Sequence, residues 1–269
     1  QPVAMTLAGP EWHAMSAVDQ RTGLFAIGKP LESGPKGPPA SLILAQLTPE
    51  GIVWKWTRPE AQLDITLCMD FDTKAERLAL VYLRGGIQMV DVRTGVTLAT
   101  LHHKVALAAF AGTMGRIAAL QQFRDVATRN EDRILLIDPA DGGIHASLTY
   151  PHRLKAFAVS PDRSLIAIAG DDQLVVILDA DTLAERYRFR AHDAAITALR
   201  FHPSLPILAS GSMDHRIKLW DYCTASLRKA FMGLNGRPSM IAFSPNGKLL
   251  ATDGLENAFR LFDISDVTH

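Results

Sequence analysis

The stretch HDAAITALRFHPSLPILASGSMDHRIKLWD, residues 192–221, decides the fold. It contains an alternating run from Ile196 to Phe201, a second run from Ile207 to Ser212, and a third that ends in Trp220-Asp221. A proline turn separates the first two runs, and a polar turn at Met213 to Arg216 separates the last two. Hydrophobicity of period two in short runs joined by tight turns predicts an antiparallel meander of three strands.

This stretch resembles a blade of the WD-repeat β-propeller family. The resemblance rests on the His before the first strand, the small residues before a turn Asp, and the closing Trp-Asp pair. In that family these residues form a hydrogen-bonded chain inside one blade, which maps here onto His192, Ser210, Asp214 and Trp220, with Ser212 as the alternative to Ser210. Such a chain satisfies polar groups that would otherwise be buried without partners. The resemblance therefore implies an architecture and a structural role for these residues, and no chemistry.

A repeat of about forty residues supports the same fold. The turn Phe201-His202-Pro203 has counterparts at Val159-Ser160-Pro161 and Phe243-Ser244-Pro245, each 42 residues away. Weaker counterparts occur at three earlier places: Val18-Asp19, Phe71-Asp72 and Phe110-Ala111. Six markers predict an all-β fold, a β-propeller with six blades of four antiparallel strands.

We predict one propeller domain over residues 1–269. Its blades are expected at about 11–61, 62–103, 104–151, 152–191, 192–235, and 236–269 plus 3–7. The last blade lacks a fourth strand, so we expect Val3 to Leu7 to pair with it and close the ring, which removes an unpaired sheet edge. Members of the family more often have seven blades, so a truncated seven-bladed propeller is the alternative.

Two insertions mark a candidate binding face. Lys29–Ala40 and Phe123–Arg133 both connect the second and third strands of their blades, and we expect both on one face together with the loops before the first strands. Arg and aromatic residues are favoured at interfaces, and loops on a rigid scaffold often bind partners. The predicted partner-binding residues are Phe123, Arg124, Arg129, Tyr150, Arg153, Arg190, Met213, His215, Arg216 and Arg237.

Two tryptophans mark the outer strand of the first blade. Trp54 and Trp56 have the same parity, so they are expected to share a sheet face. Two interpretations remain open for them, which are packing between blades and a lateral contact with a partner.

Metal and catalytic chemistry find little support. Histidines gather before predicted first strands at His102, His103, His152 and His192, but no carboxylate or cysteine recurs at a ligand spacing. Ser210-Gly211-Ser212 lies in a strand before a hairpin, whereas a nucleophile elbow needs a strand-to-helix turn. We expect no catalytic residues, no metal and no cofactor.

The bulk composition excludes some partners. The 28 basic and 28 acidic residues balance to a formal charge of zero, which argues against nucleic-acid binding. No apolar run is long enough to insert into a membrane. Cys68 and Cys223 are expected to be unpaired, and the first residue is Gln1. A cytoplasmic location is favoured, a cleaved leader is the alternative, and self-association is left open.

The function that these features favour is that of a non-enzymatic scaffold. Its loop face would bind a partner protein or peptide, within a larger assembly. The alternative is a propeller hydrolase or lyase with a site at the mouth of the central channel, because the fold alone assigns no function.

Overall fold

A computed structural model describes residues 15–19, 22–29, 41–59, 66–82, 86–122, 131–234, 236–253 and 259–267. Within these residues the regular structure is β-strand, apart from one 3-10 turn, η2 (Ser265–Val267). The chain divides into two compact units, residues 1–100 and 101–269, and each is described by itself. We call them the first unit and the second unit.

The first unit contains two four-stranded antiparallel sheets whose strands follow chain order. The first sheet comprises β1 (Met15–Asp19), β2 (Leu24–Lys29), β3 (Ser41–Thr48) and β4 (Gly51–Pro59). The second comprises β5 (Thr66–Phe71), β6 (Arg77–Tyr82), β7 (Gly86–Asp91) and β8 (Thr97–Leu101).

The second unit contains four sheets of the same kind, the last with three strands among the described residues. The first two comprise β9 (Leu107–Ala111), β10 (Arg116–Gln122), β11 (Asp132–Ile137) and β12 (Ile144–Tyr150), then β13 (Leu154–Val159), β14 (Leu165–Gly170), β15 (Leu174–Asp179) and β16 (Glu185–Arg190). The last two comprise β17 (Ile196–Phe201), β18 (Ile207–Ser212), β19 (Ile217–Asp221) and β20 (Ser226–Phe231), then β21 (Ile241–Phe243), β22 (Leu249–Asp253) and β23 (Phe259–Asp263).

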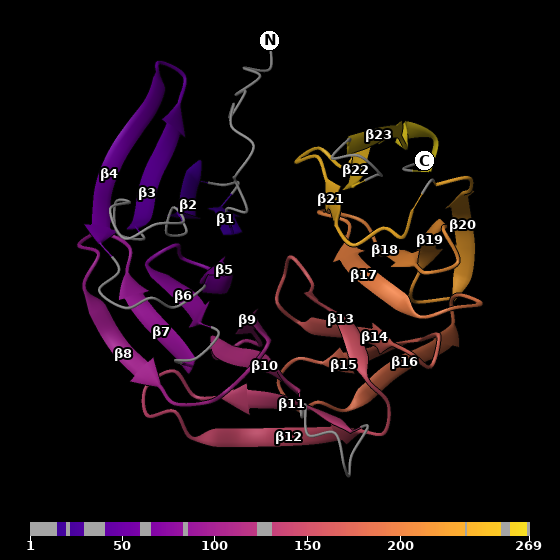
Figure 1. The fold of residues 1–269 in the computed structure, drawn as a ribbon, viewed down its shortest axis with the longest axis horizontal. Coiled ribbons are helices and arrows are strands. Elements are labelled where there is room, and N and C mark those ends of the chain that lie inside the picture. Colours follow the sequence, from indigo (N-terminus) through magenta and orange to yellow (C-terminus); the bar gives the residue numbers. More distant parts are fainter. Residues whose placement is uncertain are drawn as a thin grey trace, which may run out of the picture. The chain divides into compact units, whose positions relative to one another are not determined.

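The all-β fold of six propeller blades is confirmed in the described part of the chain. Figure 1 shows the sheets as successive blades, and the first strands of consecutive sheets contact each other within each unit, as β13 contacts β17. The runs read from residues 192–221 coincide with β17, β18 and β19. The strand expected at Val3 to Leu7, and with it the closure of the ring, lies outside the described residues, as do residues 30–40 and 123–130 of the two insertions.

Hydrophobic residues are buried where consecutive sheets face each other. In the first unit, Leu42 and Leu44 of β3 pack in one cluster with Leu78, Leu80 and Val90 of the next sheet. In the second unit, a cluster of this kind contains residues of β13–β15 and β17–β20, and Trp220 belongs to it. Each strand of a blade thus buries both of its faces, which explains why the central strands read as nearly continuous apolar runs.

The Asp that closes the third strand persists in blades that lack the Trp, because it organises the turn that follows. Asp91 accepts a hydrogen bond from the backbone N–H of Thr94 at 2.7 Å, and Asp179 accepts one from Thr182 at 2.9 Å. Asp138, Asp221 and Asp263 make the same kind of bond. An Asp side chain that accepts from a backbone N–H two or three residues later favours a turn, so this position keeps its Asp whatever precedes it.

A β-bulge overturns the prediction that Trp54 and Trp56 share a sheet face. Trp56 pairs with Leu44, and Trp54 pairs with Ala45, so Lys55 is an extra residue on β4. Because Leu44 and Ala45 point to opposite faces, the two tryptophans do so as well. Trp56 donates its indole N–H to the Val92 carbonyl at 2.7 Å, in the next sheet of the first unit. Packing between blades is therefore the role of Trp56, whereas Trp54 is 65% exposed.

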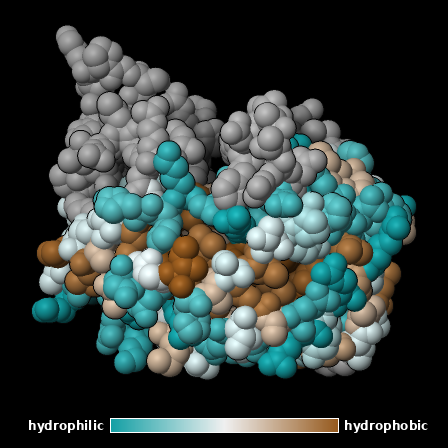
Figure 2. Space-filling view, turned by 90° about the horizontal axis from the view of Figure 1, so that it is seen from below, coloured by the Kyte–Doolittle hydropathy of each residue, from teal (hydrophilic) through white to brown (hydrophobic). Residues whose placement is uncertain are grey.

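The described residues include no helix that is long and apolar enough to cross a membrane. Cys68 and Cys223 are both free thiols. Figure 2 shows hydrophilic residues over much of the face it draws, with hydrophobic residues reaching the surface between them.

Candidate functional site

Four polar side chains of the sheet β17–β20 form a continuous hydrogen-bonded chain. His192, in the loop before β17, contacts Asp214 Oδ2 through Nδ1 at 2.8 Å and Ser210 Oγ through Nε2 at 2.8 Å. Trp220 on β19 donates its indole N–H to the same Ser210 Oγ at 3.0 Å. The chain therefore links the loop before the first strand, the middle strand, the hairpin and the third strand of one blade.

The partners determine where the protons lie. The Asp214 carboxylate accepts, so His192 donates from Nδ1 and its Nε2 accepts the hydroxyl proton of Ser210. Burial lowers the pKa of His192 below its ordinary value, against the opposing effect of Asp214. Burial alone would raise the pKa of Asp214, but hydrogen bonds from His192 and from backbone N–H groups outweigh it and lower that pKa. The pair is therefore a neutral imidazole beside a carboxylate.

Further bonds fix the tip of the β18–β19 hairpin. Asp214 accepts from the backbone N–H groups of Asp193 at 3.3 Å and Arg216 at 3.1 Å. Ser212, the alternative to Ser210 in the predicted network, accepts from the Asp214 N–H at 3.1 Å and donates to the Ala194 carbonyl at 3.1 Å. The hairpin and the loop before β17 are thus held together at one edge of the sheet.

The order Ser210, His192, Asp214 has the contacts of a catalytic triad, but its location excludes that role. In a triad the hydroxyl must reach a substrate carbonyl beside an oxyanion hole. Ser210 is 0% exposed and His192 is 1% exposed. The Ser210 oxygen also accepts the Trp220 indole N–H. The arrangement thus satisfies buried polar groups, and it offers no nucleophile to a bound substrate.

Acid is expected to destabilise the protein in two steps. The folded pKa of His192 is lowered, as is that of His202, mainly by burial, so the unfolded chain binds protons first as pH falls below about 6.5. The contribution of these neutral histidines is complete above that pH and is lost as pH falls towards the folded pKa. Asp214 and Asp179 also have lowered pKa values, about 2 for Asp179, so their contribution is lost only below about pH 4. Urea unfolding between pH 8 and 3 measures both steps, and a constant free energy of unfolding from pH 6.5 to 5 would contradict the first.

The sheet β13–β16 keeps part of the network in another form. Tyr150 lies 42 residues before His192, and Asp172 lies 42 residues before Asp214. The Tyr150 hydroxyl donates to Asp172 Oδ2, as the imidazole does in the next sheet. Burial, together with this hydrogen bond, raises the pKa of Tyr150 far above its ordinary value. Tyr150, and not the exposed His152, therefore takes the place of the structural His in this blade.

The predicted partner residues fall into three groups. Phe123, Arg124 and Arg129 lie outside the described residues. Tyr150 is only 4% exposed and its hydroxyl is engaged by Asp172, so a partner would not reach it in the folded blade. The remaining six are wholly or partly exposed, and we call them the loop face of the second unit: Arg153, Arg190, Met213, His215, Arg216 and Arg237.

The loop face has basic side chains without matching acids. Arg153 and Arg237 form no ion pair among the described residues, and Arg190 donates to the neutral Gln173 side chain at 2.7 Å. Only Arg216 has a carboxylate nearby, that of Asp193 at 3.6 Å. The acids of the same edge are occupied elsewhere, since Asp171 pairs with Lys155, Asp172 with Tyr150, and Asp214 with His192. The surface is therefore prepared for negative charge.

Two methionines extend this surface and were missed in the sequence. Met232 and Met240 are 70% and 58% exposed, in the loop that joins β20 to β21. That loop is held against β17 and β18, because Thr197 donates to the Pro238 carbonyl and Pro238 lies over Gly211. The available signal was the position of both residues in a loop before a first strand. Among the described residues, no group of three His, Cys, Asp or Glu side chains is placed to hold a metal ion.

Comparison with known proteins agrees with this geometry. A family model described as WD domain, G-beta repeat, matches residues 184–221. The match covers β16 of one sheet and β17–β19 of the next, so the sequence repeat is offset by one strand from the blade. None of the curated proteins compared with the chain matches it. The repeat match and the six blades together support membership of the WD-repeat β-propeller family.

Proposed function

We propose that this protein is a non-enzymatic scaffold whose loop face, in the second unit, binds an acidic segment of a partner protein. The observation that carries the proposal is the charge imbalance of that face, where Arg153, Arg190 and Arg237 have no carboxylate partner among the described residues. Propellers of the WD40 kind commonly bind proteins, and the fold is compatible with such a role.

Rigidity supports the proposal. The loop tips stand on hydrogen bonds that are already made, through His192, Asp214 and Ser212, so binding a partner orders few residues. Exposed Met213 and Met240 add flexible apolar contact area beside the arginines. Positive charge would steer an acidic segment towards the face, and the methionines would contact its apolar side chains.

Charge reversal tests the proposal. The variant Arg190→Glu/Arg237→Glu is compared with Lys74→Glu/Lys248→Glu, which changes the net charge equally at exposed turns between first and second strands. We expect capture of partner proteins from native extract to fall about tenfold for the first variant, since each reversal removes an attraction and adds a repulsion. Capture by the second variant should stay within about twofold, as rim charges away from an interface have small effects. Equal capture by both variants would refute the loop face as the binding surface.

A further inference from the structure

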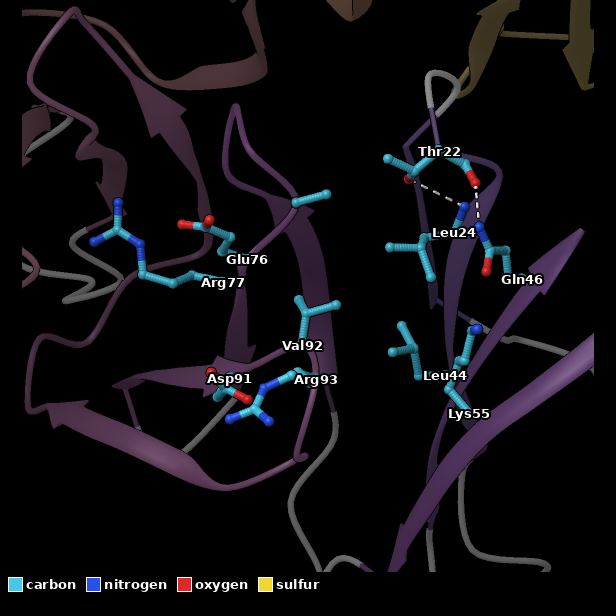
Figure 3. Close-up of a pocket in the computed structure, with 11 residues that line it drawn as sticks. Thr22, Leu24, Leu44, Gln46, Lys55, Glu76, Arg77, Asp91, Val92 and Arg93 are labelled. Atoms are coloured by element: carbon cyan, nitrogen blue, oxygen red, sulfur yellow. Dashed lines mark hydrogen bonds between the residues drawn. The ribbon is translucent and has the colours of Figure 1, made fainter.

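A pocket lies between the two sheets of the first unit, far along the chain from the loop face. Its volume is 670 Å³, and it is bordered by both sheets: Thr22, Leu24, Leu44, Gln46 and Lys55 on one side, and Ala75, Glu76, Arg77, Asp91, Val92 and Arg93 on the other. Figure 3 shows Leu44 and Val92 facing each other across the space. A cleft of this size, apolar with a few polar groups, is typical of a binding site.

The floor of the pocket is aliphatic. Leu24, Leu44 and Val92 belong to the hydrophobic cluster between the two sheets, and Leu44 and Val92 are almost fully buried. The wall beside Val92 is held in place, since Trp56 donates to the Val92 carbonyl at 2.7 Å and the indole ring lies against Gly95. An aliphatic side chain placed between Leu44 and Val92 would extend an existing core.

The charges around the pocket leave one ammonium group without a carboxylate. Arg77 is paired with Asp72 at 2.9 Å, and Asp91 accepts from the N–H and hydroxyl of Thr94, bonds that lower its pKa. Lys55 forms no ion pair among the described residues. In the view of Figure 3, Glu76 and Arg77 extend away from the space between Leu44 and Val92, whereas Lys55 lies beside Leu44.

The β-bulge explains why Lys55 is here. Lys55 is the extra residue of β4, between Trp54 and Trp56, and it lines the pocket on the Leu44 side. In a regular strand, neighbours of Trp56 would point to the opposite face. The bulge therefore brings a cation and an aromatic wall to the same side of the sheet.

We propose that this pocket binds an extended peptide segment in which an aliphatic residue stands next to an acidic residue. The aliphatic side chain inserts between Leu44 and Val92, and the carboxylate of its neighbour pairs with Lys55. The Gln46 amide, already fixed by its bond to the Thr22 carbonyl at 2.8 Å, lies on the same wall and presents its oxygen to a peptide N–H. This site is separate from the loop face, so it is a second interaction site of the scaffold.

Capped peptides test the proposal on the full chain. The probes are Ser-Leu-Glu-Leu-Ser, its Gln analogue Ser-Leu-Gln-Leu-Ser and its Ala analogue Ser-Ala-Glu-Ala-Ser, with the indole resonance of Trp56 and titration calorimetry as readouts. We expect the Glu peptide to bind about fivefold more tightly than the Gln peptide, as one partly exposed ion pair allows. The Ala peptide should bind about tenfold or more weakly, because it loses the aliphatic contact.

Matched variants assign the effect to the pocket. Lys55→Glu should abolish the preference for Glu over Gln, whereas Lys74→Glu, at an exposed position outside the pocket, should retain it. Absence of binding, equal affinity for the Glu and Gln peptides, or a preference that survives Lys55→Glu would each overturn the proposal. The Arg190→Glu/Arg237→Glu variant should bind these peptides normally, so failure here is distinguishable from failure of the loop face.

Discussion

Replacing His192 by Ala is expected to lower the free energy of unfolding by about 2 to 4 kcal/mol, because it leaves a buried hydroxyl and a carboxylate without their shared partner. Ser210 would keep only the Trp220 indole N–H, and Asp214 would keep only backbone donors. Urea unfolding followed by tryptophan fluorescence measures the loss. The combined variant His192→Ala/Ser210→Ala should cost less than the sum of the two single changes, since the second removes a group already left without its partner.

The control for this prediction is His145→Ala. His145 is an exposed residue of β12, so its replacement should change the free energy of unfolding by less than about 0.5 kcal/mol. If His192→Ala costs no more than His145→Ala, the buried chain of hydrogen bonds does not stabilise the blade.

Replacing Gly247 by Ala is expected to cost about 3 to 5 kcal/mol, among the larger effects of a single methyl group. Gly247 has a φ of +71°, and an added Cβ would lie 2.2 Å from His202 Nε2. The imidazole has no room to withdraw, because it is buried and accepts the backbone N–H groups of Ser204 and Leu205. The methyl group would therefore have to separate β21–β22 from the turn after β17.

Gly233 provides a matched control. Its φ is +70°, nearly the same as that of Gly247, but a Cβ there would meet nothing within 4 Å. Gly233→Ala should therefore cost only about 1 kcal/mol, the strain of a left-handed backbone. Thermal and urea unfolding of the two variants separate backbone strain from steric conflict, and similar losses for both would contradict the close contact with His202.

The strands and the polar network could be predicted because local chemistry dictates them. Period-two alternation in residues 196–221 places β17–β19, and the residues His192, Ser210, Asp214 and Trp220 have few other ways to satisfy their polar groups. The same logic places an Asp at each turn after a third strand, where it accepts backbone N–H groups.

Other features escaped because they depend on geometry that alternation does not record. The parity of Trp54 and Trp56 assumed a regular strand, and one extra residue at Lys55 reversed the outcome. Tyr150 looked like an exposed interface residue, although its 42-residue distance from His192 marked it as the equivalent structural position. The pocket beside Lys55 needs two sheets to be placed against each other, which no single stretch encodes.

The loop face and the network share a hairpin but divide its residues between two roles. Asp214 points inward to His192, whereas Met213 and His215 beside it are exposed, and His215 has a φ of +62°. A hairpin tip with one residue in the left-handed region turns sharply, so alternate side chains point to the blade and to solvent. Stability and binding should therefore respond to different substitutions within four residues.

Hydrogen–deuterium exchange of the chain, with and without its captured partner, tests this division most directly. We predict that partner binding slows exchange at the loop face, in residues 152–155, 190–193, 213–216 and 236–240, and leaves the outer strands β12, β16 and β20 unchanged. Slower exchange confined to those outer strands, with the loop face unaffected, would contradict the account.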